Sequence, residues 1–173
     1  MPIAALILST LAFWLIYWFI RMGGMDHVHA KHTHRKEEAR RAAAREREGT
    51  ACLRAIDDPR DAAIILMLVM ARVAGDPTRE QIATIEKLAC EVLGLHGELA
   101  ERMTQARFIA GRAESFAQAA GLFSDLFNKH LTAHERLQLV SMLEEVARLD
   151  RPCPEQREGL ELLKRRIGLA PAR

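Results

Sequence analysis

The sequence has few aromatic residues and almost no excess of either charge. Its 173 residues include one Tyr, two Trp and six Phe, and the formal net charge is only +2. The positive surplus lies in residues 1–48, which hold eight Lys or Arg against five acids. Nucleic-acid binding usually requires a basic surface with interleaved aromatic side chains. We therefore expect no nucleic-acid partner.

The sequence also lacks the cysteine spacing of a disulfide framework. Cys52, Cys90 and Cys153 are an odd number, and none of them belongs to a CxxC pair. This pattern fits a reducing compartment, in which disulfides are rare. We expect all three to be small buried hydrophobic residues.

Motifs of the common enzyme classes are absent as well. The sequence contains no GxSxG motif, no phosphate-binding loop and no His-Pro-Asp signature of a J domain. His130 and His134 are four residues apart, as in the zinc-binding HExxH motif, but the second position is not Glu. A capping box that starts at Thr132 also predicts a helix boundary between them. We expect no enzyme activity, no catalytic residue and no resident cofactor.

The first twenty residues have the pattern of a membrane span. Residues 2–20 carry no charge, and only Ser9 and Thr10 interrupt the apolar run, which ends in a cluster of aromatic residues. A helix of this length, at about 1.5 Å per residue, covers roughly 28 Å, close to the hydrocarbon core of about 30 Å. We predict that residues 1–21 form a transmembrane anchor in contact with the lipid bilayer.

A cleaved signal peptide is the alternative interpretation, with a small-residue site at 28–30. Three features argue against cleavage: no basic residue precedes the apolar run, the run is longer than usual, and the site lies well beyond its end.

Basic residues flank the C-terminal side of the run: Arg21, Lys31, Arg35 and Lys36. By the positive-inside rule, we expect a single-pass protein of the inner or cytoplasmic membrane, with its N-terminus out and its C-terminal domain in the cytoplasm.

A histidine cluster follows the predicted anchor, formed by His27, His29, His32 and His34. In an extended segment, residues two apart project to the same side, so each pair could offer two nitrogens to Zn, Ni or Cu. The alternative is a weakly basic tether whose charge rises below about pH 6.5 and attracts anionic headgroups. We favour the tether, because nothing rigid fixes a ligand geometry there.

Residues 35–48 read RKEEARRAAARERE, and Ala is the only apolar residue type among them. Their helix propensity is high, but the segment has no apolar face to bury. We predict a charged stalk helix that stands in solvent. It belongs to a linker over residues 22–56.

From Asp57 onward, the sequence predicts an all-α domain of six helices. Asp58 and Pro59 open the first, and residues 62–71 are apolar without a break, which is typical of a helix buried on all sides. The other five should begin near Thr78, Glu98, Phe116, Thr132 and Pro154, with stops at Gly94 and Gly168. The side chains expected to face inward from these five helices are Ile82, Ile85, Leu88, Ala89, Val92, Leu93, Leu99, Met103, Ala106, Ile109, Phe116, Ala120, Phe123, Phe127, Leu137, Val140, Leu143, Val146, Ala147, Leu160, Leu163 and Ile167.

A weak internal repeat relates residues 71–95 to residues 147–169. Each copy is a helix end, a short polar turn and an amphipathic helix that closes in Gly-Leu. Two such units joined by a middle hairpin resemble the TerB-like family, the tellurite-resistance-associated helical domain also found in membrane-anchored DnaJ-like chaperones. The resemblance covers about residues 57–169 and leaves residues 170–173 as a tail.

In that family each turn usually reads Ala-Asp-Gly followed by acidic residues, and the carboxylates are proposed to bind a divalent metal. Here Ala74 stands at the leading Asp of the first turn, and Arg151 stands at the Gly of the second. The carboxylates that remain as candidate metal ligands are Asp76, Glu80, Asp150 and Glu155. Because an Arg repels a cation and Ca²⁺ takes six or more oxygens, we expect these residues to cap the following helices instead.

Two functional hypotheses follow. The first is a membrane-anchored, non-enzymatic adaptor or scaffold that binds a cytoplasmic protein, in the stress or tellurite-resistance type of response that the TerB-like resemblance implies. The second is a metal-responsive membrane protein that uses the histidine cluster or the remaining acidic turns. Both are compatible with a homo-oligomer.

Overall fold

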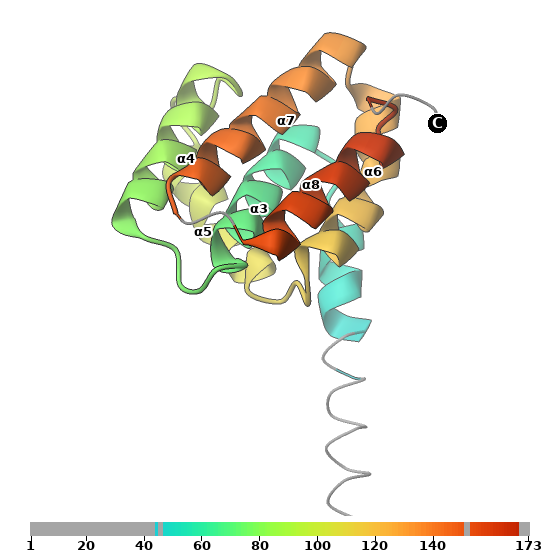
Figure 1. Ribbon diagram of the computed structural model, residues 1–173. Coiled ribbons are helices and arrows are strands. Elements are labelled where there is room, and N and C mark those ends of the chain that lie inside the picture. The colour runs from blue at the N-terminus through green and yellow to red at the C-terminus, as the bar shows by residue number, and fades with distance from the viewer. Residues whose placement is uncertain (1–43, 45–46, 151–152, 170–173) are drawn as a thin grey trace, which may run out of the picture. The chain divides into compact units, whose positions relative to one another are not determined.

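Residues 44, 47–150 and 153–169 are described by the computed structural model, and all their regular structure is helical. The chain divides into two compact units, Met1–Ala44 and Arg45–Arg173, and the described fold belongs almost entirely to the second. After a helical segment over residues 47–54, its elements are α3 (Pro59–Arg72), α4 (Arg79–Glu91), α5 (Leu99–Ala110), α6 (Phe116–His130), α7 (Ala133–Arg148) and α8 (Pro154–Arg166) (Figure 1). Within the described residues, the predicted all-α class is confirmed, with six helices after Asp57.

None of the helices in the described ranges is long and apolar enough to cross a membrane. The predicted anchor in residues 1–21, the histidine cluster and nearly all of the predicted stalk lie outside those ranges. The membrane anchor and the orientation therefore stay predictions from the sequence.

Helix α3 is the centre of the bundle, as the unbroken apolar run predicts. All ten residues from 62 to 71 are buried, and α3 contacts α4, α5, α6 and α7 (Figure 1). At its start, the Asp58 side chain accepts a hydrogen bond of 2.9 Å from the Arg60 backbone N–H, and Pro59 fills the first helical position. These features fix where the central helix begins, because they satisfy or remove N–H groups that have no partner within the helix.

Capping residues set several of the other helix boundaries where the sequence places them. Thr78 forms a capping box with Gln81 at the start of α4, and Thr132 forms one with Glu135 at the start of α7. Beyond the ends of α4 and α8, Gly94 and Gly168 have φ values of 69° and 74°, which other residues rarely adopt. The predicted starts and stops of these helices are confirmed.

The internal repeat has a structural counterpart in two buried glutamines. Gln81 and Gln156 are the third residues of α4 and α8, and they are 0% and 1% exposed. Each Oε1 accepts a hydrogen bond from the backbone N–H three residues earlier, of 2.9 Å from Thr78 and 3.1 Å from Cys153. The two copies differ at Nε2. That of Gln156 donates to the Met70 carbonyl at 3.2 Å, whereas that of Gln81 has no partner within the described residues.

Two residues predicted to face inward are exposed. Leu137 is 55% exposed, and Leu139 is buried in its place. Leu139 precedes the fully buried Leu143 by four residues, which puts both on one face of α7, while Leu137 lies about 120° from Leu143 around the helix. Val92 is 42% exposed because it is the C-cap of α4, where the chain leaves the helix.

The packed unit begins earlier than the predicted boundary at residue 57. Residues 47–54 are helical, and Leu53 of this segment is fully buried in the core. A Cβ at Gly49 would lie 2.4 Å from the Arg112 carbonyl oxygen, so glycine allows this helix to approach the turn after α5. The Gln118 amide also donates to the Thr50 hydroxyl at 3.2 Å. The end of the sequence-assigned linker is therefore part of the helical unit.

Candidate docking pocket

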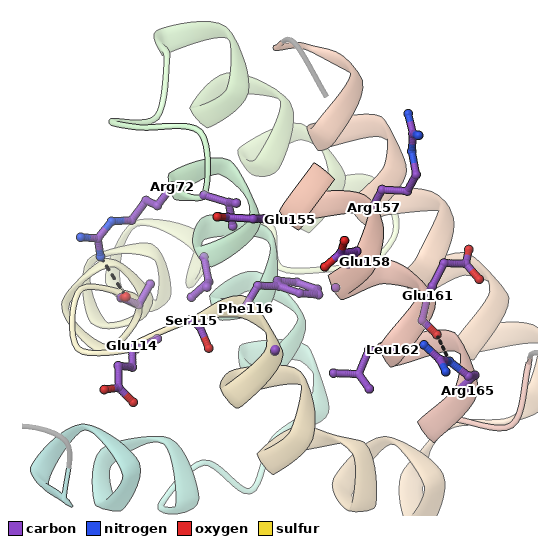
Figure 2. Close-up of a pocket in the computed structure, with 16 residues that line it drawn as sticks. Arg72, Glu114, Ser115, Phe116, Glu155, Arg157, Glu158, Glu161, Leu162 and Arg165 are labelled. Atoms are coloured by element: carbon purple, nitrogen blue, oxygen red, sulfur yellow. Dashed lines mark hydrogen bonds between the residues drawn. The ribbon is translucent and has the colours of Figure 1, made fainter. Parts of the chain in front are cut away.

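A pocket of about 880 Å³ opens between the end of α3, the turn from α5 to α6, the start of α6, and α8 (Figure 2). The elements around it come from distant parts of the sequence. The residues that line it are Val69, Arg72, Val73, Ala110, Ala113, Glu114, Ser115, Phe116, Ala117, Glu155, Arg157, Glu158, Gly159, Glu161, Leu162 and Arg165. Its size is that of a site for a small molecule or for a few side chains of a partner protein.

Apolar residues form the base of the pocket. Phe116 is the first residue of α6, and its position follows from the Ser115 cap, whose hydroxyl accepts a hydrogen bond from the Gln118 N–H at 3.1 Å. The Phe116 ring packs directly on α8 at Gly159, where a Cβ would lie 2.5 Å from the ring. Glycine at 159 thus lets the ring close the base of the pocket. The half-buried Val73 and Leu162 line the pocket near it.

The arginines around the pocket are either bonded within the fold or turned away from it. Arg72 donates to the Ala110 carbonyl at 2.9 Å, and Arg165 donates to the Glu161 carbonyl at 3.3 Å. Figure 2 shows the Arg157 side chain directed away from the pocket. None of the three arginines forms an ion pair with another described residue.

The glutamates on α8 divide into two groups. Glu161 forms an ion pair with Lys164 at 3.2 Å, and Lys164 also bonds to Glu144 of α7 at 3.1 Å. The hydrogen bond to Glu144 raises the pKa of Lys164, and this side chain joins α7 and α8. Glu155 and Glu158 have neither an ion pair nor a side-chain hydrogen bond to any described residue, and both line the pocket (Figure 2).

A second polar cluster, at the start of α3, has a structural role. Arg102 of α5 donates to Asp58 and Asp61 at 2.9 Å each and to Glu98 at 2.9 Å. Burial alone would raise the pKa of Asp58, but the hydrogen bonds from Arg60 and Arg102 outweigh it and lower this pKa to about 2. The same carboxylates raise the pKa of Arg102. The cluster joins the N-terminal ends of α3 and α5.

The structure brings one of the eight candidate metal ligands to the pocket. Glu155 lies in the first turn of α8 and lines the pocket, whereas Asp76 and Glu80 are exposed at the turn before α4 and in its first helical turn. Asp150 is half-buried just after α7, and His27, His29, His32 and His34 lie outside the described residues. Within the ranges that the structure covers, no three His, Cys, Asp or Glu side chains come together as metal ligands would.

The remaining sequence predictions concern histidine and cysteine. His130 is the last residue of α6, and α7 starts at Ala133, so the predicted helix boundary between His130 and His134 is confirmed. Cys52, Cys90 and Cys153 are free thiols, as expected, but they are half-buried rather than fully buried.

The pocket itself was not predicted from the sequence. Its one signal was Gly159, since a glycine inside a helix costs about 1 kcal/mol relative to Ala and often marks close packing.

The comparisons with known proteins leave the family open. No protein family, no curated protein and no solved structure matches this chain. The resemblance to the TerB-like family therefore stays a prediction from the sequence.

Proposed function

We propose that this chain is a non-enzymatic adaptor, anchored in the membrane by residues 2–20, whose helical unit binds a cytoplasmic partner protein at the pocket beside α8. The observation that carries the proposal is the pocket itself, in which apolar side chains around Phe116 lie next to the carboxylates of Glu155 and Glu158, which form no ion pair with another described residue. An apolar centre with a polar rim is the usual composition of a protein-binding site. A stress or tellurite-resistance type of response is the context that the TerB-like resemblance suggests.

The chemistry of the pocket supports binding better than catalysis. Its one hydroxyl among the lining side chains, that of Ser115, caps α6, and no His or Cys side chain lines the pocket. A nucleophile needs a base within hydrogen-bonding distance, and the pocket supplies no such pair. The arginines that could hold an anionic substrate are bonded to carbonyl groups or directed outward.

Site-specific photocrosslinking in cells tests the proposal. A photoreactive residue at Leu162 of the full-length chain should crosslink to a specific protein, because this side chain lines the pocket. The same residue at Glu91, exposed at the end of α4 and outside the pocket, is the matched control. Replacing the exposed Ala117 by Trp should fill the pocket and abolish the crosslink from position 162. Equal crosslinking from both positions, or none from 162, would refute the proposal.

A further inference from the structure

The charges around the pocket specify the chemistry of its partner. We propose that the pocket binds a basic amphipathic helix of the partner protein, with an apolar side chain against the residues around Phe116 and Lys or Arg side chains bonded to Glu155 and Glu158. This inference rests on the proposed adaptor function and adds the class of segment that the adaptor recognises.

The apolar part of the pocket accounts for the amphipathic character of the ligand. Phe116 is 3% exposed and closes the base, while Val73, Ala113 and Leu162 are half-buried around it, so part of their apolar surface still contacts water. A volume of about 880 Å³ exceeds that of any single side chain and can take two or three from one face of a helix. Burying that surface supplies the non-directional part of the affinity.

The unpaired carboxylates account for the basic character. Four Glu and three Arg line the pocket, but Arg72 and Arg165 are hydrogen-bonded to carbonyl groups and Arg157 is directed outward. Glu155 and Glu158 are exposed and form no ion pair with another described residue, so both carboxylates can accept a cation from a partner. Lys and Arg suit this position because their aliphatic stems cover apolar surface while the charged ends reach a carboxylate. An acidic segment or an anionic lipid surface would place like charge against these two carboxylates.

The spacing on α8 accounts for the helical form. Glu155, Glu158 and Leu162 are separated by three and four residues, so their side chains lie in one row along α8. A second helix that packs along this row presents its own side chains at the same intervals. A partner helix with basic residues three or four positions apart, and an apolar residue on the same face, can therefore contact both glutamates and Leu162 at once.

Binding of designed peptides to the full-length chain in phosphatidylcholine nanodiscs tests the inference. The probes are a fluorescent Lys/Leu amphipathic peptide of about four helical turns, near 14 residues, and the same peptide with every Lys replaced by Glu. Anisotropy is measured with empty nanodiscs subtracted. The Lys peptide should bind, and Glu155→Gln with Glu158→Gln should weaken it by about tenfold, because two partly exposed ion pairs together contribute a factor of this order. The matched control is Glu101→Gln with Glu145→Gln, which removes the same charge from exposed positions on α5 and α7 and should leave the affinity unchanged.

A charge-reversed variant makes the test independent of any loss of folding. Glu155→Lys with Glu158→Lys should bind the Glu peptide in preference to the Lys peptide. Equal binding of both peptides to the original chain, or an unchanged affinity in the Gln double variant, overturns the proposal. A crosslink from Leu162 in cells without binding of the Lys peptide overturns the basic-helix partner and leaves the adaptor function standing. A Leu162 crosslink that contains only two copies of this chain overturns the proposal in favour of self-association.

Discussion

The charge on Asp58 is the residue-scale feature with the clearest consequence for pH dependence. The pKa of its carboxyl is about 2 in the fold and 3.8 for the free side chain. Because the folded value is the lower one, the charge stabilises the fold fully above about pH 4, and this contribution is lost as the pH falls toward 2. We expect Asp58→Asn to lower the free energy of unfolding by roughly 1–2 kcal/mol at pH 7 and by nearly nothing at pH 2, since Asn keeps the helix cap.

Urea denaturation of Arg45–Arg173 between pH 2 and 7 measures this effect. Asp57→Asn is the matched control, because Asp57 is the exposed neighbour and has no ion pair within the described chain. It should leave the pH profile unchanged. A constant difference between Asp58→Asn and the original sequence at every pH would show that the ion pairs with Arg60 and Arg102 do not stabilise the fold.

The buried glutamines provide a matched pair at the same scale. Gln156→Glu and Gln81→Glu both keep the side-chain oxygen that caps the helix, and both remove the N–H donor. At position 156 the lost donor is bonded to the Met70 carbonyl, whereas at position 81 it has no partner among the described residues. We expect Gln156→Glu to lower the free energy of unfolding by about 1 kcal/mol more than Gln81→Glu, the usual net contribution of one hydrogen bond. Equal losses would show that the bond to Met70 contributes nothing.

At the scale of elements, the helical segment over residues 47–54 is the one whose assigned role the structure changes. Residues 47–54 place Leu53 in the core, and burial of one Leu side chain contributes about 1.5–3 kcal/mol. A fragment that begins at residue 45 should therefore unfold cooperatively with a free energy higher by about that amount than a fragment that begins at residue 57. Chemical denaturation followed by far-ultraviolet circular dichroism is the measurement. In the longer fragment, Leu53→Ala should reproduce most of the loss, and Arg54→Ala, an exposed neighbour, should not.

At the scale of the whole molecule, orientation in the membrane is the testable feature. The basic residues Arg21, Lys31, Arg35 and Lys36 follow the apolar run, and no basic side chain precedes it. The positive-inside rule then holds the C-terminal side in the cytoplasm. We expect an alkaline phosphatase fusion after Arg173 to be inactive and a cytoplasmic fluorescent reporter at the same place to be bright. An active phosphatase fusion would contradict the predicted orientation and with it a cytoplasmic partner.

Metal dependence tests the alternative function. A ligand at a hundred times its dissociation constant stabilises the native state by about 2.7 kcal/mol, which raises the melting temperature of a domain of this size by several degrees. Because the TerB-like resemblance puts Ala74 and Arg151 where a metal-binding turn would have Asp and Gly, we expect millimolar Ca²⁺ or Mg²⁺ to shift the melting temperature of the helical unit by close to zero. A rise of about five degrees that Asp150→Ala removes would instead favour the metal-responsive hypothesis.

The helix pattern was predictable from the sequence because its signals are local. Asp58, Thr78, Thr132 and Pro154 satisfy or remove backbone N–H groups within one turn of their own position, so they mark helix starts without knowledge of the fold. The unbroken apolar run over residues 62–71 likewise determined that α3 would be central, because a helix that is apolar on all sides is stable only when neighbouring helices cover it.

Only the tertiary structure decided the contacts between segments that lie far apart in the chain. From the sequence, Leu53 belongs to the predicted charged linker, but in the structure it is buried in the core. Leu137 was predicted to face the core, but the packed face of α7 leaves it exposed. The pocket is decided the same way, since it needs Gly159 of α8 against Phe116 of α6 and Arg72 of α3 bonded to the Ala110 carbonyl of α5. Local propensity and periodicity specify which residues form a helix, but which face is covered, and by what, depends on packing that no short window of sequence contains.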